Sequence, residues 1–216
     1  MNWLELNSDE RAVLTRRVVI VGSESTGKTT LARELVGHYR GIGGIWADTR
    51  WVAEYGREYT ETLLERQGSV AAEGEAASAE WTARDFALIA IEQQRLEDEA
   101  AASGSPVLFC DTDAFATQLW ERRYLGDGST AALDAVHTSP ERGLYLVADL
   151  AGVPFEQDGI RDGEGYREEM QHWFVEELTA RGENWTLLTG TRPQRLAAAI
   201  AAVDAALAAT VASLDT

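Results

Sequence analysis

The sequence is poor in cysteine, in basic side chains and in long hydrophobic runs. Cys110 is its one cysteine, which excludes an internal disulfide and makes the reducing cytoplasm the expected compartment. The net charge is −17, and no local basic patch offsets it, so we expect no nucleic-acid partner. No apolar run reaches the roughly 18 residues that a membrane-spanning helix needs, and residues 1–11 do not resemble a secretory signal. We therefore expect no membrane partner.

Histidine is scarce as well. His38, His137 and His172 are scattered along the chain without a second ligand at metal-binding spacing, so structural roles are expected for them. Hydrophobic residues, by contrast, make up 45% of the 216 residues. That share is enough for a sizeable core, and the length suits one α/β domain over 1–216 with a small lid.

Short apolar runs alternate with helical patterns along the chain. The apolar runs predict buried strands at 17–21, 49–56, 105–113, 142–152 and 183–193. Amphipathic or alanine-rich stretches predict helices at 29–39, 84–101, 114–125, 166–180 and 196–207. Because strands that alternate with helices form right-handed βαβ units, the expected fold class is α/β, with a five-stranded, mostly parallel sheet flanked by helices.

A phosphate-binding turn follows the first predicted strand. Gly22, Gly27, Lys28 and Thr29 match the pattern G-x-x-x-x-G-K-[ST] in full, between a predicted strand and a predicted helix. The glycines allow backbone N–H groups to point inward at a helix N-terminus, where they can cradle phosphate oxygens. The Lys28 ammonium can reach the outer phosphates, and the Thr29 hydroxyl can bind Mg²⁺. The turn is therefore expected to bind a nucleoside triphosphate.

An acidic residue ends the third predicted strand. In "VLFCDTD" an apolar run leads to Asp111, and a strand-end carboxylate is the usual partner of Mg²⁺ in a P-loop protein. The alternative is an acid that caps the following helix, a role open to Asp113 but not to Asp111. We expect Asp111 at the metal, together with Thr29.

Proteins with this phosphate-binding turn, the P-loop, include motors, helicases, switches and kinases, and further sequence features distinguish among these classes. Motors and helicases need longer chains and nucleic-acid contacts, and no N-K-x-D guanine reader occurs here. A small-molecule kinase needs a group that orients or deprotonates the acceptor hydroxyl. In "AEYGREY" the second strand leads to Glu54, Tyr55 and Arg57, at the sheet edge where ligands bind in open α/β folds. The alternative for Glu54 is a surface ion pair with Arg57.

Two glycine-containing segments are predicted to lie between the regular elements. Residues 155–168 are rich in glycine and acids and include Arg161, so they are predicted to form a lid that delivers a guanidinium to bound phosphates. The alternative is a solvated arginine on a long loop. Residues 67–80 are of low complexity and are predicted to be a mobile connection.

Aromatic residues are frequent, with seven tryptophans in the chain. Trp46, Trp51 and Trp120 lie near the predicted site edge, as do Tyr55 and Tyr59. Aromatic rings beside carboxylates suit a flat, positively charged base. Core packing is the alternative for any one of them.

These motifs together resemble those of the NadR-type ribosylnicotinamide kinases. "GSESTGKTTL", "WVAEYGREY", "DTDAFATQLW" and "VPFEQDGIRD" occur in the same order in that family, across roughly 17–205. The resemblance implies a P-loop nucleoside-kinase fold that transfers the γ-phosphoryl group of ATP to the 5′-hydroxyl of nicotinamide riboside, with Mg²⁺, in NAD salvage. The residues that it implies for ATP are Gly22, Ser25, Thr26, Gly27, Lys28, Thr29, Thr30 and, in the lid, Arg161.

The same resemblance implies a nucleoside site and a mechanism. Glu54, Tyr55, Arg57 and Asp113 would face the nucleoside. Glu54 would orient or deprotonate the hydroxyl, with Asp111 or Asp113 as rival for that role, while Lys28 would offset charge on the moving phosphoryl group. Only 16 residues precede the first predicted strand, too few for the nucleotidyltransferase domain of the bifunctional relatives. We therefore expect neither adenylyl transfer nor repressor activity.

Two other functions stay open. The acceptor could be another nucleoside or a nucleoside monophosphate, for which Arg57 and the less well placed Arg50 would form a thin phosphate clamp. The chain could instead be a regulatory protein that hydrolyses ATP slowly and binds a protein partner.

Overall fold

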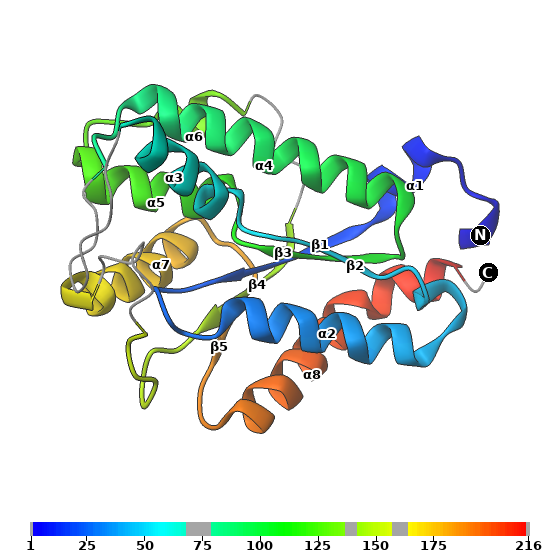
Figure 1. Ribbon diagram of the computed structural model, residues 1–216. Coiled ribbons are helices and arrows are strands. Elements are labelled where there is room, and N and C mark those ends of the chain that lie inside the picture. The colour runs from blue at the N-terminus through cyan, green and yellow to red at the C-terminus, as the bar shows by residue number, and fades with distance from the viewer. Residues whose placement is uncertain (1, 68–78, 137–141, 157–163, 215–216) are drawn as a thin grey trace.

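The computed structural model describes residues 2–67, 79–136, 142–156 and 164–214. Its centre is a five-stranded parallel sheet with the strand order β2-β3-β1-β4-β5, seen edge-on in Figure 1. The α/β fold class with a five-stranded parallel sheet is thus confirmed. The strands are β1 (Arg16–Val21), β2 (Arg50–Val52), β3 (Val107–Asp111), β4 (Arg142–Ala148) and β5 (Trp185–Leu188).

Helices connect consecutive strands and cover both faces of the sheet. The α-helices are α1 (Ser8–Leu14), α2 (Lys28–Ile42), α3 (Tyr55–Arg66), α4 (Ala83–Ser103), α5 (Ala114–Leu125), α6 (Ala131–Asp134), α7 (Arg167–Ala180) and α8 (Arg192–Leu214). Three short 3₁₀ helices are η1 (Trp3–Glu5), η2 (Gly44–Trp46) and η3 (Glu164–Tyr166). None of the helices that the structure describes is both long and apolar enough to cross a membrane.

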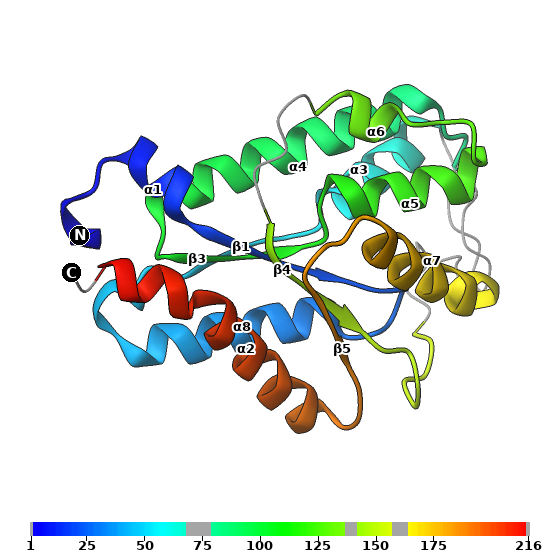
Figure 2. The same ribbon diagram turned by 180° about the vertical axis from the view of Figure 1, so that it is seen from behind.

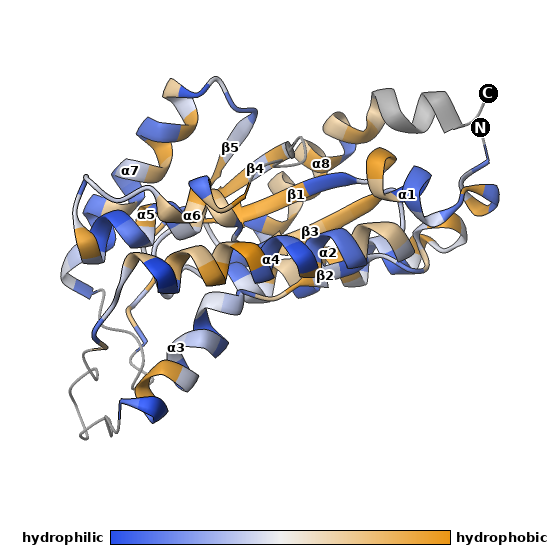
Figure 3. Cartoon of the chain, turned by 90° about the horizontal axis from the view of Figure 1, so that it is seen from above, coloured by the Kyte–Doolittle hydropathy of each residue, from blue (hydrophilic) through white to orange (hydrophobic). Residues whose placement is uncertain are grey.

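The alternation of side chains along the strands divides the core into two layers. Val18 and Ile20 of β1 pack against α2 and α8 on one face, whereas Val19 and Val21 pack against α5 and α7 on the other. Figures 1 and 2 show α2 and α8 together on one side of the sheet, with α4, α5 and α6 on the opposite side. Viewed from above in Figure 3, the strands are mostly apolar, while the helices around them carry both polar and apolar residues. Both faces of the sheet are covered, as parallel sheets require.

The second strand and the helix after it differ from the prediction. The apolar run at 49–56 predicts one strand, but the strand is only Arg50–Val52, and helix α3 begins at Tyr55. Helix α3 buries only Leu63 and Leu64, so its sequence lacks the long apolar stripe by which helices are predicted. The structure corrects the reading of 55–56 as strand.

The low-complexity segment between α3 and α4 lies mostly outside the described residues, which omit 68–78. Its two ends are held together, because Gln67 donates to the Glu80 carbonyl and accepts from the Glu80 N–H, both at 3.0 Å. Helix α4 then begins in a reciprocal capping box formed by Thr82 and Asp85.

Candidate active site

The strand order explains why residues far apart in the sequence meet at one site. The phosphate turn follows β1, Glu54 follows β2, and Asp111 ends β3. These three strands are neighbours in the sheet and run parallel. Their carboxyl ends therefore share one edge, where ligands of open α/β sheets bind. All three groups line one cavity of about 610 Å³.

Two glycines give the phosphate turn its shape. Gly22 has φ +140°, and a Cβ there would lie 2.7 Å from the Ala148 carbonyl oxygen of β4, closer than packed atoms allow. Gly27 has φ +84° and is the N-cap of α2, with no side chain to cap the helix. The first N–H groups of α2 therefore face the cavity, where they can receive a phosphate.

Lys28 lies folded over this turn. Its side chain is buried, and its ammonium donates to the carbonyl oxygens of Gly22 and Ser23 at 3.1 and 3.0 Å. Thr26 donates to the same Ser23 carbonyl at 2.9 Å. Lys28 is the only lysine in the chain, so the sole ammonium side chain of an acidic protein lies at its phosphate turn.

The predicted metal residues are in direct contact. The Thr29 hydroxyl donates to Asp111 Oδ2 at 2.5 Å, and burial raises the pKa of Asp111 while the charge of Lys28 opposes this. The other oxygen, Oδ1, is buried and has no hydrogen-bond partner among the described residues. A carboxylate oxygen and a hydroxyl beside a phosphate turn fit Mg²⁺, which prefers oxygen ligands and shares them with substrate phosphates.

Glu54 lines the same cavity as Lys28, close enough for the two charges to interact. Burial raises its pKa to about 7; Lys28 lowers the pKa, and the nearby carboxylates of Asp111 and Glu24 raise it. A carboxyl group with a pKa near 7 can hold or release a proton at physiological pH, as a general base must.

Part of the cavity wall is aromatic. Trp81, Phe86, Trp120 and Tyr124 line it, from the segment before α4, from α4 and from α5. The ring of Trp81 lies 5.0 Å from that of Phe86 and 5.2 Å from that of Tyr124, centroid to centroid. The cavity thus joins a phosphate turn, two carboxylates and an aromatic wall.

Two of the four predicted nucleoside residues do not line this cavity. Asp113 is buried as the N-cap of α5, where it accepts from the Ala116 N–H at 2.9 Å and from the Tyr145 hydroxyl at 2.9 Å. The capping alternative therefore describes Asp113. Tyr55 lines a second, shallower cavity beside β2, which Glu54 also lines, rather than the first. Arg57 does line the first cavity and has an exposed ion pair with Glu61 at 3.8 Å, and its charge also lowers the pKa of Glu54.

The predicted aromatic residues divide in the same way. Trp51 and Trp120 line the cavity. Trp46 packs against Tyr39 in the core, and the Tyr59 hydroxyl donates to Asp85 at 2.7 Å. Sequence reasoning missed the ring set of Trp81, Phe86 and Tyr124, because no local motif marks side chains that meet only through helix packing.

The basic residues around the cavity also differ from expectation. Arg33, one turn into α2, lines the cavity and lies over the Trp51 ring at 5.2 Å. Arg50 lines the second cavity only. Arg195 of α8 is buried and donates to the carbonyls of Thr26, Asp149 and Ala151, so it ties the phosphate turn to the loop after β4. The sequence feature that could have indicated a buried role for Arg195 is the presence of an arginine in an otherwise apolar helical stripe.

The predicted lid is described only at its two ends. Arg161 lies outside the described residues, which omit 157–163. On one side Ser25 of the phosphate turn accepts from the Glu156 N–H at 3.1 Å. On the other side Arg167 donates to the Glu24 and Val153 carbonyls, each at 3.1 Å. Both ends of the segment therefore contact the phosphate turn.

The fold and the phosphate turn together define a P-loop NTPase. Residues 17–195 match the family model described as an AAA domain, and the chain belongs to this family. A comparison with curated protein sequences finds no significant match.

Solved structures with the same fold are nucleotide-binding proteins. NadR in complex with NAD and AMP-PNP superposes with a TM-score of 0.71 at 22% identity, and NadR in complex with NR with a TM-score of 0.70 at 22% identity. The alignments cover 94% of this chain but 52% of the NadR chain, so this chain spans about half the length of NadR. Thymidylate kinase from Ehrlichia chaffeensis superposes with a TM-score of 0.62 at 12% identity, covering 88% and 98% of the two chains. The fold is thus that of P-loop nucleoside and nucleotide kinases.

Proposed function

We propose that the protein is an ATP-dependent nucleoside kinase that phosphorylates the 5′-hydroxyl of nicotinamide riboside. The observation that carries this proposal is the continuous cavity, which joins the phosphate turn, the carboxylates of Glu54 and Asp111, and the aromatic wall. A donor phosphate bound at one end and a base bound at the other would bring a sugar hydroxyl beside Glu54. Such positioning is most of what phosphoryl transfer requires.

The reaction assigns a task to each group at the phosphate end. The 5′-oxygen attacks the γ-phosphorus, the bond from that phosphorus to the β–γ bridging oxygen breaks, and Glu54 takes the hydroxyl proton. Lys28 would leave the Gly22 and Ser23 carbonyls for the phosphate oxygens, and Arg161 is proposed as a second cation from the lid. Thr29 and Asp111 would hold Mg²⁺, which neutralises charge on the phosphates when bound.

The aromatic wall and the acids support a flat cationic base. A pyridinium ring can stack on Trp81 or Tyr124 and is attracted to the negative faces of aromatic rings. The net charge of −17 also favours a cationic acceptor approaching the cavity. The NadR structures contain NR and NAD, and this agrees with the same class of acceptor.

A nucleoside monophosphate is the second candidate acceptor. Arg33 and Arg57 both line the cavity, and two arginines can clamp an acceptor phosphate. The likeness to thymidylate kinase agrees with this alternative. Arg33 already lies over Trp51, and Arg57 pairs with Glu61, so both guanidinium groups would have to move to form the clamp.

A screen of acceptors separates these functions. ADP release would be measured with ATP and Mg²⁺ and with nicotinamide riboside, thymidine, adenosine, thymidylate or no acceptor. We expect the largest kcat/KM for nicotinamide riboside, with mononucleotide formation confirmed by mass spectrometry. A larger value for a monophosphate would replace the proposal by the second candidate. ADP release that is indifferent to every acceptor would identify the regulatory ATPase.

A further inference from the structure

Helix α3 begins without help from its own N-cap residue. Glu54 occupies the N-cap position with φ −64° and ψ 102°, and its side chain makes no capping hydrogen bond. The first N–H of the helix, that of Tyr55, instead donates to Gln93 Oε1 of α4 at 3.0 Å. An N-cap acid ordinarily turns back to the N–H groups of its first turn. Glu54 instead lines the cavity, where its carboxyl group interacts with the charges of Lys28 and Asp111.

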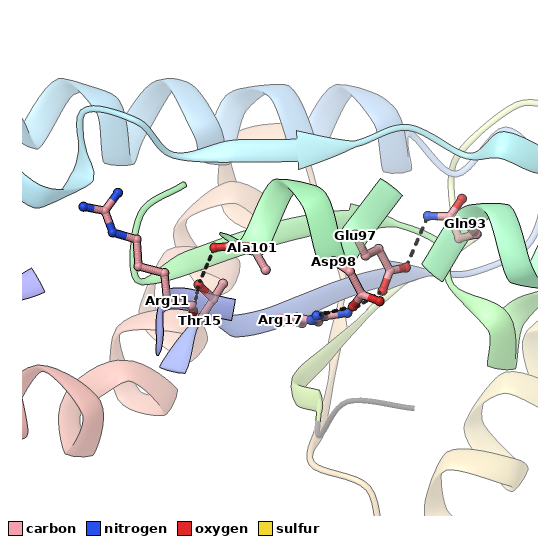
Figure 4. A network of polar contacts seen from close by, with 7 residues as sticks. All are labelled: Arg11, Thr15, Arg17, Gln93, Glu97, Asp98 and Ala101. Atoms are coloured by element: carbon pink, nitrogen blue, oxygen red, sulfur yellow. Dashed lines mark hydrogen bonds and ion pairs between the residues drawn. The ribbon is translucent and has the colours of Figure 1, made fainter. Parts of the chain in front are cut away.

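Gln93 is itself held by a buried polar chain. Its Nε2 donates to Glu97 Oε1 at 3.3 Å, and Glu97 Oε2 accepts from Arg17 of β1 at 3.4 Å. The exposed fractions of Gln93, Glu97 and Arg17 are 1%, 0% and 2%. Arg17 also donates to Asp98 at 2.7 Å. Figure 4 shows these side chains converging between α4 and β1.

The hydrogen bonds among Gln93, Glu97 and Arg17 fix the orientation of the Gln93 side-chain amide. Because Glu97 accepts from the Nε2 group, the Oε1 atom of Gln93 must face Tyr55, and only an oxygen can accept that N–H. Arg17 in turn compensates the buried charge of Glu97, which would otherwise be costly. The arrangement is more specific than core packing requires, since apolar side chains would fill the same stripe of α4.

The backbone nitrogen of Tyr55, which Gln93 holds, connects these buried polar side chains to the candidate site. Tyr55 N is bonded to the carbonyl carbon of Glu54, so holding it restricts the direction in which the Glu54 side chain leaves the backbone. Phe86 and Ile89, earlier on the same buried stripe of α4, line the cavity. Helix α4 therefore supplies both part of the cavity wall and the side chain that holds the backbone N–H of Tyr55.

We propose that Gln93, oriented by Glu97 and Arg17, is a positioning residue that holds Glu54 toward the acceptor hydroxyl. The proposal rests on the proposed function of Glu54 as the proton acceptor. The proposal gives these three buried side chains a role in turnover, in addition to their contribution to folding.

The first test compares two glutamine substitutions on α4. Gln93→Leu removes the acceptor of the Tyr55 N–H, and Gln94→Leu makes the same chemical change at the next residue. At a temperature where both are folded by circular dichroism, we expect Gln93→Leu to lower kcat on the order of tenfold, because small misplacements of catalytic groups are costly. The dissociation constant for AMP-PNP should stay within about twofold. Gln94→Leu should keep the wild-type kcat.

The second test exchanges the amide and the carboxylate. Gln93→Glu alone puts two carboxylates side by side and should lower kcat and the melting temperature. In the double variant Gln93→Glu/Glu97→Gln the charge is restored, and Tyr55, residue 97 and Arg17 can again all be paired. We expect it to regain most of the wild-type kcat. A folded double variant that stays as slow as the single one would overturn the proposal, as would a Gln93→Leu kcat within twofold of wild type.

Hydrogen exchange separates this proposal from the proposed function. The peptide that covers 53–60 should exchange faster in Gln93→Leu than in the wild type and recover in the double variant, whatever the acceptor. If no nucleoside is phosphorylated by the wild type, the proposed function fails while this exchange result still stands. If exchange at 53–60 is unchanged, the anchoring role fails independently of activity.

Discussion

The two ends of the cavity are built in different ways. At the phosphate end, one turn of consecutive residues between Gly22 and Thr29 supplies the backbone N–H groups, the ammonium and the hydroxyl. At the aromatic end, rings come from three places in the chain, the segment before α4, α4 and α5. A binding site formed by the backbone of consecutive residues can be recognised from a sequence motif, whereas a site formed by side chains that pack together from distant segments cannot.

The two ends also differ in what maintains them. Thr26, Lys28 and Arg195 satisfy carbonyl oxygens of the phosphate turn, so that end depends on hydrogen bonds and charge. The aromatic wall depends on ring contacts such as Trp81 with Tyr124 at 5.2 Å. Disruption at the first end should therefore affect ATP and chemistry, and disruption at the second should affect the acceptor alone.

The largest effect is expected at Lys28. Lys28→Ala removes the cation at the phosphate turn and should lower kcat/KM on the order of 10²-fold or more, because charge on the transferred group is then uncompensated. Steady-state ADP release measures it. Lys28→Arg, which keeps the charge with another shape, should recover only part of the loss.

The wild-type protein offers an independent check, because Lys28 is its only lysine. An amine-reactive reagent can modify only this side chain and the terminal amine, and peptide mass spectrometry distinguishes the two. ATP with Mg²⁺ should protect Lys28 from modification. Modification that nucleotide does not slow would contradict its contact with phosphate.

A smaller loss is expected at Glu54, which lines the same cavity. Glu54→Gln should lower kcat about 10²-fold and leave ATP affinity within about twofold, since only proton transfer is removed. The base must be deprotonated, so wild-type turnover should rise with pH through the pKa of about 7 and level off above it. The variant should lose this rise.

Two controls sharpen the Glu54 experiment. Asp113→Asn changes a carboxylate that caps α5, and because asparagine also caps helices well, turnover should stay within about threefold. The second control is stability. A carboxyl group whose pKa is higher in the folded state contributes stability that is lost as pH rises, here between its ordinary value and about 7. Glu54→Gln should remove that part of the pH dependence of unfolding.

The smallest effect is expected at the aromatic end. Trp81→Ala removes a ring from the wall and should raise the KM for the nucleoside about tenfold, since stacking of a base on an aromatic side chain is worth about 1–3 kcal/mol. ATP affinity and kcat should change little. Trp173, a partly buried tryptophan of α7 that packs against the core and does not line the cavity, is the matched control, as Trp173→Ala. An equal rise in KM for both variants would contradict a specific role for the wall.

Much of the fold could be predicted because its signals are local. Each apolar run overlaps one of the five strands, and helix α5 matches its predicted range of 114–125. Helix α3 escaped prediction because it buries little more than Leu63 and Leu64. The strand order itself depends on contacts between distant segments, and no window of sequence contains it.

The residues of the candidate site likewise fall into those that local sequence predicts and those that depend on packing between distant segments. The sequence by itself determined the phosphate turn and the strand-end Asp111, because glycine conformation and strand–turn–helix order are properties of adjacent residues. Only the tertiary structure decided that Asp113 caps a helix, that Tyr55 lines the second cavity, and that Gln93 accepts a hydrogen bond from the Tyr55 N–H of another helix. The physical reason is that side-chain direction depends on packing between elements, which the spacing of residues along one element does not encode.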